Sequence, residues 1–212
     1  MKYDAIILAA GSAVRSKLNY NKVFYKLKGK EIIYLSTYNF QNDPDCQKII
    51  VAVNENEKDK ILDILKDFSK IELVIGGKTR QQSVKNALFK VEQDYVLIHD
   101  GARPNFTNDL LDKLKKDVLV HEVVIPMVSL TDTIFMVKDN KVSQILNRNE
   151  LGKVQTPQAF KSSLIKKAHS IAIKDDYSDD SMMIKDLLKK DIYVIDGEIT
   201  NKKYTYSDDF KE

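Results

Sequence analysis

Cysteine is almost absent from this sequence, because Cys46 is the only one among 212 residues. No disulfide can form within such a chain, which is typical of proteins in a reducing compartment. Long apolar runs are also missing: residues 5–10 and 123–128 fall far short of the roughly 20 residues that cross a bilayer. Residues 1–4 lead directly into a strand, without the apolar region of a signal peptide. We therefore expect a cytoplasmic protein with no membrane partner.

A dominant charge of one sign is lacking as well. The formal net charge is +3, from 34 Lys and Arg against 31 Asp and Glu, and the lysines are spread along the chain. This balance argues against a dedicated nucleic-acid-binding protein, although local basic clusters could hold phosphate groups. The length and the ordinary apolar content predict one core, and we expect a single domain over residues 1–212.

Short apolar segments alternate along the chain with segments of helical spacing. Strands are predicted at residues 5–9, 48–53, 71–75, 95–99, 123–127 and 192–195. These runs are continuously apolar, as is typical of strands that are buried on both faces of a parallel sheet. The pattern predicts an α/β fold with a Rossmann-like, doubly wound, mostly parallel sheet. Ligands bind such sheets beyond the carboxyl ends of the strands.

Two segments depart from this alternation. Residues 133–137 and 141–145 flank Lys138-Asp139-Asn140, which is turn chemistry, so a protruding β-hairpin arm is predicted at about residues 131–150. An isolated hairpin is marginally stable, so the arm is expected to mediate a homodimer. Further on, Thr156-Pro157-Gln158 is predicted to start a loop before a helix from Phe160. Asp179 and Asp180 are expected to be exposed charges at the start of the last long helix.

The loop after the first strand is the first candidate binding element. Ala9, Ala10 and Gly11 are small enough to let the backbone approach a ligand, and N–H groups there could cradle phosphates. Arg15 and Lys22 follow and could neutralise them. The alternative is a small-residue turn with two solvated cations. Neither a P-loop nor a dinucleotide-binding fingerprint is present.

Two more strand ends carry small residues together with polar ones. Gly76-Gly77 allows close backbone approach, and Ser83 could cap the next helix or contact a base; a plain turn with a capped helix is the alternative. Asp100 ends an apolar strand before Gly101, where a carboxylate would suit Mg²⁺ beside substrate phosphates, or would simply cap a turn. His99 is interpreted as structural. No nucleophile constellation is evident, and such cations and carboxylates suit phosphoryl or nucleotidyl transfer.

Taken in chain order, these segments resemble the cytidylyltransferase family that makes CDP-methylerythritol for isoprenoid synthesis. The resemblance covers almost the whole chain. It is carried by Ala9-Ala10-Gly11 with Arg15 and Lys22, Gly76-Gly77 with Arg80 and Ser83-Val84, His99-Asp100 with Ala102-Arg103-Pro104, Asp132-Thr133, Arg148, Thr156-Pro157-Gln158-Ala159-Phe160, Ser178-Asp179-Asp180 and Asn201-x-Lys203-x-Thr205. Each motif is weak alone, whereas eight in this order are hard to obtain by chance.

The resemblance implies that the protein joins CMP from CTP to 2-C-methyl-D-erythritol 4-phosphate. The catalytic group would comprise Arg15, Lys22 and Lys203. Asp100 would support Mg²⁺. The nucleotide would be bound by Ala9, Ala10, Gly11, Ser12, Gly77, Ser83, Asp100 and Gly101. The polyol phosphate would be bound by Arg103, Ser178 and Thr205, together with Thr133 and Arg148 from a partner's arm.

The chain also departs from the family pattern. Ala13 replaces a glycine, Asn21 replaces a proline before the lysine, and Ser16 replaces a methionine. Gly101 replaces an alanine and Ser178 a threonine. Two alternatives stay open at this point: a ribitol-5-phosphate cytidylyltransferase, and a catalytically silent nucleotide-binding regulator.

Overall fold

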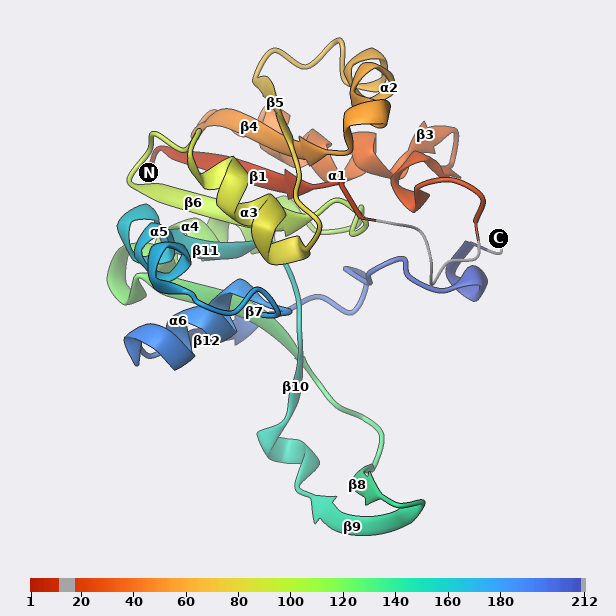
Figure 1. Ribbon diagram of the computed structural model, residues 1–212, viewed down its shortest axis with the longest axis vertical. Coiled ribbons are helices and arrows are strands. Elements are labelled where there is room, and N and C mark those ends of the chain that lie inside the picture. Colours follow the sequence, from red (N-terminus) through yellow and green to blue (C-terminus); the bar gives the residue numbers. More distant parts are fainter. Residues whose placement is uncertain (12–17, 211–212) are drawn as a thin grey trace.

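A computed structural model describes residues 1–11 and 18–210. Its centre is an eight-stranded sheet in the order β10-β7-β11-β6-β1-β4-β5, with β12 paired to the outer side of β7 (Figure 1). The strands are β1 (Tyr3–Leu8), β4 (Cys46–Val53), β5 (Ile71–Ile75), β6 (Tyr95–Asp100), β7 (Val123–Ser129), β10 (Gly152–Val154), β11 (Gln158–Lys161) and β12 (Tyr193–Asp196). Within this sheet the six predicted strands are all present.

Parallel pairing dominates the sheet, as the sequence predicts. β1 pairs in parallel with β4 and β6, β4 with β5, and β7 with β12. The sequence reading missed β10 and β11, which run antiparallel to their neighbours. The helix predicted from Phe160 is present, but its predicted start is wrong by two residues, because residues up to Lys161 form β11 between β6 and β7. The helix α5 follows only at Ser162–Ile171.

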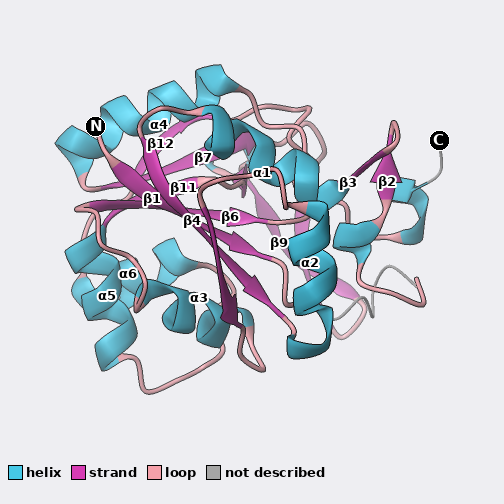
Figure 2. Ribbon diagram, turned by 90° about the horizontal axis from the view of Figure 1, so that it is seen from above, coloured by secondary structure: helices cyan, strands magenta, loops and turns pink. Residues whose placement is uncertain are grey.

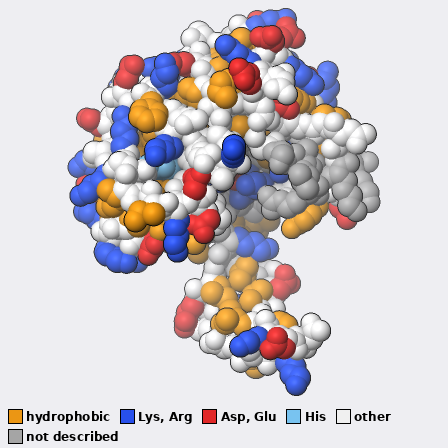
Figure 3. Space-filling model, in the orientation of Figure 1, with side chains coloured by type: hydrophobic (Ala, Val, Ile, Leu, Met, Phe, Trp, Pro, Cys, Tyr) orange, Lys and Arg blue, Asp and Glu red, His pale blue; other side chains and the backbone are white. Residues whose placement is uncertain are grey.

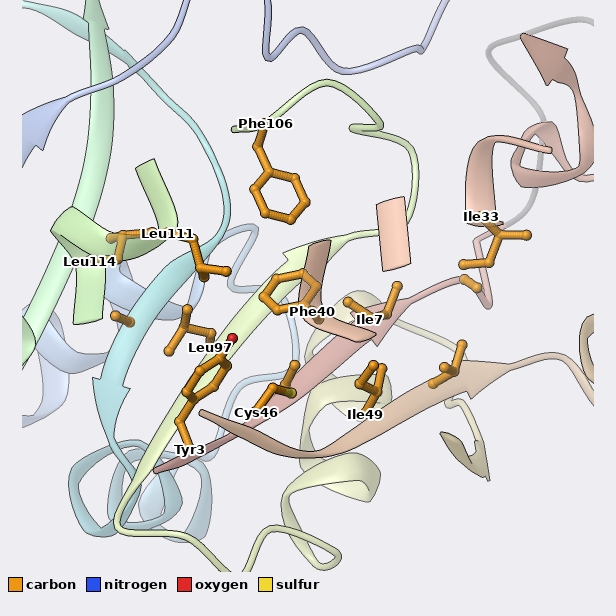
Figure 4. Close-up of a cluster of buried hydrophobic side chains, with 14 of the residues drawn as sticks. Tyr3, Ile7, Ile33, Phe40, Cys46, Ile49, Leu97, Phe106, Leu111 and Leu114 are labelled. Carbon is orange, nitrogen blue, oxygen red and sulfur yellow. The ribbon is translucent and has the colours of Figure 1, made fainter. Parts of the chain in front are cut away.

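Helices cover both faces of the sheet, which gives three layers (Figure 2). The helices α1 (Ile32–Asn42), α2 (Lys58–Ile64) and α4 (Asn108–His121) cover one face. On the other face lie α3 (Arg80–Leu88), α5 and α6 (Asp180–Leu188). In the apolar core between the sheet and the α1 layer, Phe40 of α1 lies between the rings of Tyr3 and Phe106, at centroid distances of 6.5 and 5.0 Å (Figure 4). The buried strands thus have apolar neighbours above and below, which explains their continuous apolar runs.

A small subdomain beside the sheet brings the end of the chain to the beginning. It contains η2 (Lys22–Phe24), β2 (Lys26–Leu27) and β3 (Lys30–Glu31). Tyr204 and Phe210, the latter in η5 (Ser207–Phe210), pack there against Leu27 and Ile32. The hydroxyl group of Tyr25 also donates to the carbonyl oxygen of Phe210 at 2.6 Å. These contacts carry the segment around Lys203 back to the carboxyl end of β1.

The predicted hairpin arm is present and projects from the body (Figure 1). Its strands are β8 (Ile134–Lys138) and β9 (Lys141–Leu146), and η4 (Arg148–Glu150) leads back to β10. Asp139 and Asn140 have φ values of 51° and 59°, which is the left-handed turn expected of such residues. Apolar side chains cover much of the arm's visible surface (Figure 3). Its large exposed apolar residues are Phe135, Met136, Val137, Val142 and Ile145, with 47 to 71% of their surface accessible. Within the described residues, no helix is both long and apolar enough to cross a membrane.

Candidate active site

A cleft of about 460 Å³ lies at the carboxyl ends of β1, β4, β5 and β6. This is the edge of a parallel sheet at which ligands are expected. Among the described residues that line the cleft, four are basic and one is acidic. They are Lys22, Lys78, Arg80, Lys203 and Asp100. The excess of positive charge suits a polyanionic ligand.

Small residues bring two walls of the cleft into direct contact. A Cβ atom on Gly76 would lie 2.5 Å from the Cβ of Ala10, and a Cβ on Gly77 would lie 2.1 Å from that of Gln82. Such distances are impossible for real side chains. Glycine at position 76 therefore lets the β5 exit pack against the loop after β1, and glycine at position 77 lets it pack against the first turn of α3.

Ser83 has a different structural role from the cap that the sequence suggested. Thr79 is the N-cap of α3, because its side chain accepts from the backbone N–H of Gln82 at 3.0 Å. The hydroxyl group of Ser83 donates to the carbonyl oxygen of Thr79 at 2.9 Å and accepts from the N–H of Gly77 at 3.0 Å. Ser83 thus fixes the Gly77 loop on the first turn of α3, with its side chain at the cleft wall.

Asp100 is the centre of the charge cluster. Its carboxylate lies 2.8 Å from Nζ of Lys203, 3.4 Å from Nε of Arg103 and 3.6 Å from Nε of Arg80. Burial alone would raise the pKa of Asp100, but the three cations, Lys203 foremost, hold that pKa well below its usual range. The carboxylate is therefore ionised at neutral pH and joins three separate segments of the chain.

Behind Asp100, a buried polar network fixes the end of β6. The hydroxyl group of Thr156 accepts from the backbone N–H of Asp100 at 3.0 Å and lies 3.0 Å from Nδ1 of His99. Nε2 of His99 lies 2.9 Å from the carbonyl oxygen of Arg103, which can only accept, so we assign the ring proton to Nε2, and the Thr156 hydroxyl group donates to Nδ1. Burial lowers the pKa of His99 to about 4, so the ring is neutral. The prediction that His99 has a structural role agrees with these contacts.

The network continues to the segment that carries Lys203. The side-chain amide of Asn201 donates to the carbonyl oxygen of Thr156 at 2.9 Å, and Nη1 of Arg103 donates to that of Asn201 at 2.9 Å. The hydroxyl group of Thr205 donates to the carbonyl oxygen of Lys203 at 3.2 Å. Lys203 is therefore held between two fixed points of the backbone.

The expectation that Asp180 is an exposed helix charge is wrong. Its side chain is 1% exposed and pairs with Nη1 of Arg80 at 2.6 Å, while His169 lies 3.4 Å from the other carboxylate oxygen. Asp179 does act at the helix start, because its side chain accepts from the N–H groups of Ser181 and Met182. Arg80 thus links α6 through Asp180 to Asp100 in the cleft, and burial of Asp180 is explained by its paired charge.

The loop before α6 is attached to the α3 side of the cleft through Gln81. The amide of this buried residue donates to the carbonyl oxygen of Lys174 at 2.8 Å, and its oxygen accepts from the N–H of Tyr177 at 3.1 Å. Ser178 follows directly and is exposed, with its hydroxyl group near the sulfur of Met182. The position of Ser178 therefore depends on α3, the same helix that fixes Gly77.

The structure brings most, but not all, of the predicted site residues to the cleft. Its lining includes Ala10, Gly11, Lys22, Gly77, Ser83, Asp100, Gly101 and Lys203. Ala9, Arg103, Ser178 and Thr205 are not among the lining residues, although Arg103 contacts Asp100 and Thr205 contacts Lys203. Thr133 and Arg148 belong to the arm and also stand outside the lining; Nη1 of Arg148 donates to the carbonyl oxygen of Thr131 at 2.7 Å. Ser12 and Arg15 lie outside the described residues.

Comparison with known proteins agrees with this arrangement. The family model of 2-C-methyl-D-erythritol 4-phosphate cytidylyltransferase, IspD, matches residues 3–212. The chain belongs to this family. The enzyme of this name from Bacillus pumilus is 36% identical over 215 residues, covering 99% of this chain and 94% of the relative. That from Bacillus velezensis is 37% identical, with 99% and 93% covered. A solved 4-diphosphocytidyl-2C-methyl-D-erythritol synthase from Anaerococcus prevotii superposes with a TM-score of 0.87 at 28% identity, over 99% and 93% of the two chains.

Two departures from the family pattern have a structural explanation. A Cβ atom on Gly101 would lie 2.8 Å from the carbonyl oxygen of Leu8 and 3.3 Å from Cδ1 of Ile33, so glycine fits a tight approach of β6 to β1 in this chain. Asn21 has a φ of −61°, which is a value that proline would impose. In the part of the chain that the structure describes, nothing explains the exchange of threonine for Ser178.

Sequence reasoning missed several residues that build the site. Thr156 and Asn201 were recognised only as parts of motifs, and their buried hydrogen bonds to the Asp100 region could not be inferred. Lys78 and Asn54 line the cleft without having been singled out. A signal did exist for both, because Asn54 directly follows one predicted strand and Lys78 lies three residues beyond the end of another, and ligands are expected at such strand ends.

The arrangement is suited to binding and neutralising phosphates. The only described acidic residue that lines the cleft is Asp100. No group of three or more potential metal ligands occurs among the described His, Cys, Asp and Glu residues. A single ionised carboxylate fits Mg²⁺, which commonly binds through one or two carboxylates and the substrate's own phosphates.

Proposed function

We propose that this protein transfers CMP from CTP to 2-C-methyl-D-erythritol 4-phosphate and releases pyrophosphate. The observation that carries the proposal is the cleft in which Lys22 and Lys203 converge beside Asp100, in a chain of the IspD family. The curated relatives bear the name of this activity, and neither ribitol phosphate transfer nor a silent regulator is favoured.

The nucleotide is proposed to occupy the cleft with its base toward α3. Gly77 and Ser83, next to Ala10, offer close backbone approach for cytosine. The backbone of residues 9–12, together with Arg15 and Lys22, would hold the triphosphate. Lys22 lines the cleft at the start of η2, and this placement supports its role as a phosphate ligand.

The transfer needs one bond to form and one to break. An oxygen of the acceptor phosphate attacks the α-phosphorus of CTP, and the bond from that phosphorus to the bridging oxygen of the β-phosphate breaks. The electron pair leaves with pyrophosphate. Lys22 and Lys203 stabilise the negative charge that accumulates on the α-phosphoryl oxygens, so the protein supplies position and charge instead of a nucleophile.

Asp100 is proposed as the protein ligand of Mg²⁺. Its carboxylate faces the cleft and is ionised, which fits a hard cation that also needs phosphate oxygens. When bound, Mg²⁺ would neutralise charge on the triphosphate. Asp100 would at the same time keep its contacts with Arg80 and Arg103, which orient the carboxylate.

The acceptor is proposed to bind across a homodimer. Arg103, Ser178, Lys203 and Thr205 would contribute from one subunit, and Thr133 and Arg148 from the arm of its partner. Support comes from the arm itself, which exposes apolar residues and carries Thr133 and Arg148 outside the cleft of their own chain. A cytoplasmic location is also part of the proposal, supported by Cys46 as the only cysteine.

A substrate panel tests the proposal. Pyrophosphate release is measured with each of the four ribonucleoside triphosphates and Mg²⁺, and with methylerythritol phosphate or ribitol 5-phosphate as acceptor. We expect release with CTP and methylerythritol phosphate, and little with ribitol phosphate. Faster release with ribitol phosphate would reassign the acceptor, and no release with either acceptor would refute the activity.

A further inference from the structure

The residue before Lys22 makes an unusual set of contacts. Asn21 is 6% exposed, and its Nδ2 donates to the carbonyl oxygen of Ala9 at 2.7 Å and to Oε2 of Glu57 at 2.9 Å. Both hydrogens of the amide are therefore used. The amide oxygen lies 3.4 Å from the backbone nitrogen of Val23 and caps η2. One side chain thus joins the end of β1, the start of η2 and a third segment.

That third segment is the corner between β4 and α2. Glu57 belongs to η3 (Glu55–Glu57), and its Oε2 also accepts from Nδ2 of Asn54 at 2.8 Å. Farther along, Nζ of Lys60 lies 4.0 Å from the centre of the Phe24 ring. The contacts at positions 21 and 24 lie on either side of Lys22, so η2 is fixed to this corner at two points.

We propose that Asn21 and Glu57 are positioning residues for Lys22, acting through the hydrogen bonds that tie η2 to Ala9 and to the β4–α2 corner. The inference rests on the proposed function, in which Lys22 binds the triphosphate and stabilises the transferred phosphoryl group. The proposal identifies the hydrogen bonds that hold the backbone of Lys22 in place, which neither the composition nor the motifs of the sequence indicate.

Geometry favours positioning over a purely structural role. The buried side chains of Val23 and Phe24 already attach η2 to the core, so the stability of η2 has a source other than the hydrogen bonds of Asn21. Asn21 itself lines the cleft beside Lys22, and Glu57 is only partly buried. A long, flexible lysine is useful in catalysis only if its backbone is held in place, and a displacement of about 1 Å can lower a rate about 100-fold.

The hydrogen-bond pattern also identifies the most informative substitution. Asn21→Asp keeps the shape of the side chain but replaces both donors by an oxygen that faces the Ala9 carbonyl and the Glu57 carboxylate. Like charges and unpaired acceptors at this buried point should displace η2. Asn56→Asp is the matched control, because it adds the same charge to the same corner at an exposed residue.

The experiment is a double-mutant cycle between Asn21→Asp and Lys22→Ala, with pyrophosphate release and CTP affinity as separate measurements. We expect Asn21→Asp to lower kcat about 10- to 100-fold in the wild-type background and less than about twofold in the Lys22→Ala background. The KM for the acceptor should stay unchanged, and Asn56→Asp should match the wild type. Glu57→Ala, which removes one of the two acceptors, should give a smaller loss with the same dependence on Lys22.

Equal losses from Asn21→Asp in both backgrounds would overturn the inference, as would an unchanged kcat. If Asn21→Asp does not fold, the cycle with Glu57→Ala decides in the same way. The CTP dissociation constant, measured by calorimetry, needs no turnover and is expected to rise severalfold only when Lys22 is present. Failure of the proposed function would instead be seen as an inactive wild-type protein, so the two outcomes are distinguishable.

Discussion

Nζ of Lys203 lies 2.8 Å from a carboxylate oxygen of Asp100, and both groups face the same cleft. Asp100 ends the central strand β6 in the middle of the sequence and Lys203 lies near the end of the chain, so their contact joins the C-terminal segment to the centre of the sheet. The side chain of Lys203 is 33% exposed whereas that of Asp100 is 10% exposed, which leaves the ammonium group accessible to a ligand.

Replacement of Lys203 should affect the chemical step. We expect Lys203→Ala to lower kcat by about 100-fold or more, because it removes a cation from the charge that develops on the α-phosphoryl group. The neighbouring Lys202 is the matched control, since it lies outside the cleft lining and pairs with Asp209. Steady-state kinetics with both variants tests the role, and equal effects at positions 202 and 203 would contradict it.

His99 should make stability depend on pH. Its pKa is about 4 in the folded protein against 6.5 as the ordinary value, because the neutral ring is buried. Between these values the unfolded chain binds a proton that the native protein does not, so stability falls as pH is lowered from about 6.5 to 4. Replacement with glutamine, which cannot be protonated, should remove about 2–3 kcal/mol of this loss between pH 7.5 and 4.5.

Urea unfolding of the wild type and of His99→Gln at the two pH values measures this difference. We expect the variant to start from lower stability at pH 7.5, because glutamine alters the geometry of the hydrogen bonds to Thr156 and Arg103. The informative quantity is therefore the change in the free energy of unfolding between the two pH values, measured separately for each protein. An equal change in both would show that His99 does not titrate as its burial requires.

The proposed dimer predicts complementation between inactive subunits. If Arg148 serves the partner's cleft, a heterodimer of Arg148→Ala and Lys22→Ala subunits contains one intact site and should recover about half of the wild-type activity. A mixture of Lys22→Ala and Lys203→Ala is the matched control, because both residues line the cleft of one chain and no intact site can form. The absence of rescue in purified heterodimers would place Arg148 outside the partner's site.

Gly101 predicts a substitution that is harmful although it restores the residue usual in the family. The Cβ of Gly101→Ala would meet the backbone oxygen of Leu8 at 2.8 Å, and β1 cannot move without disturbing the sheet. We expect a loss of about 1–3 kcal/mol in the free energy of unfolding. Gly11→Ala is the control, because a Cβ there meets nothing within 4 Å. Equal thermal stability of the two variants would show that β6 adapts freely.

The sequence predicts those parts of the fold that depend on local composition. Continuous apolar runs identify the parallel strands because both of their faces are buried. β11 was missed because four residues between a loop and a helix show no periodicity, and their pairing depends on β6 and β7 from elsewhere in the chain. The start of the following helix was placed two residues early, at Phe160, for the same reason, since a buried aromatic residue fits either structure.

The site was predictable where strand ends carry small or charged residues, as at Gly77 and Asp100. It was not predictable where distant residues become partners. Asp180 belongs to a run of acidic residues, which is typical of a solvated turn. Only the fold brings Nη1 of Arg80 to within 2.6 Å of its carboxylate. Asn21 likewise was recognised only as a departure from a motif, because its acceptors belong to Ala9 and Glu57.

The stereochemical course at the α-phosphorus tests the central claim most directly, namely that the acceptor phosphate attacks without a protein nucleophile. CTP with a chiral α-thiophosphate is turned over with methylerythritol phosphate, and the configuration of the product is determined by phosphorus NMR. A single in-line displacement predicts inversion. Retention of configuration would require a covalent nucleotidyl-protein intermediate and would contradict the roles assigned to Lys22 and Lys203.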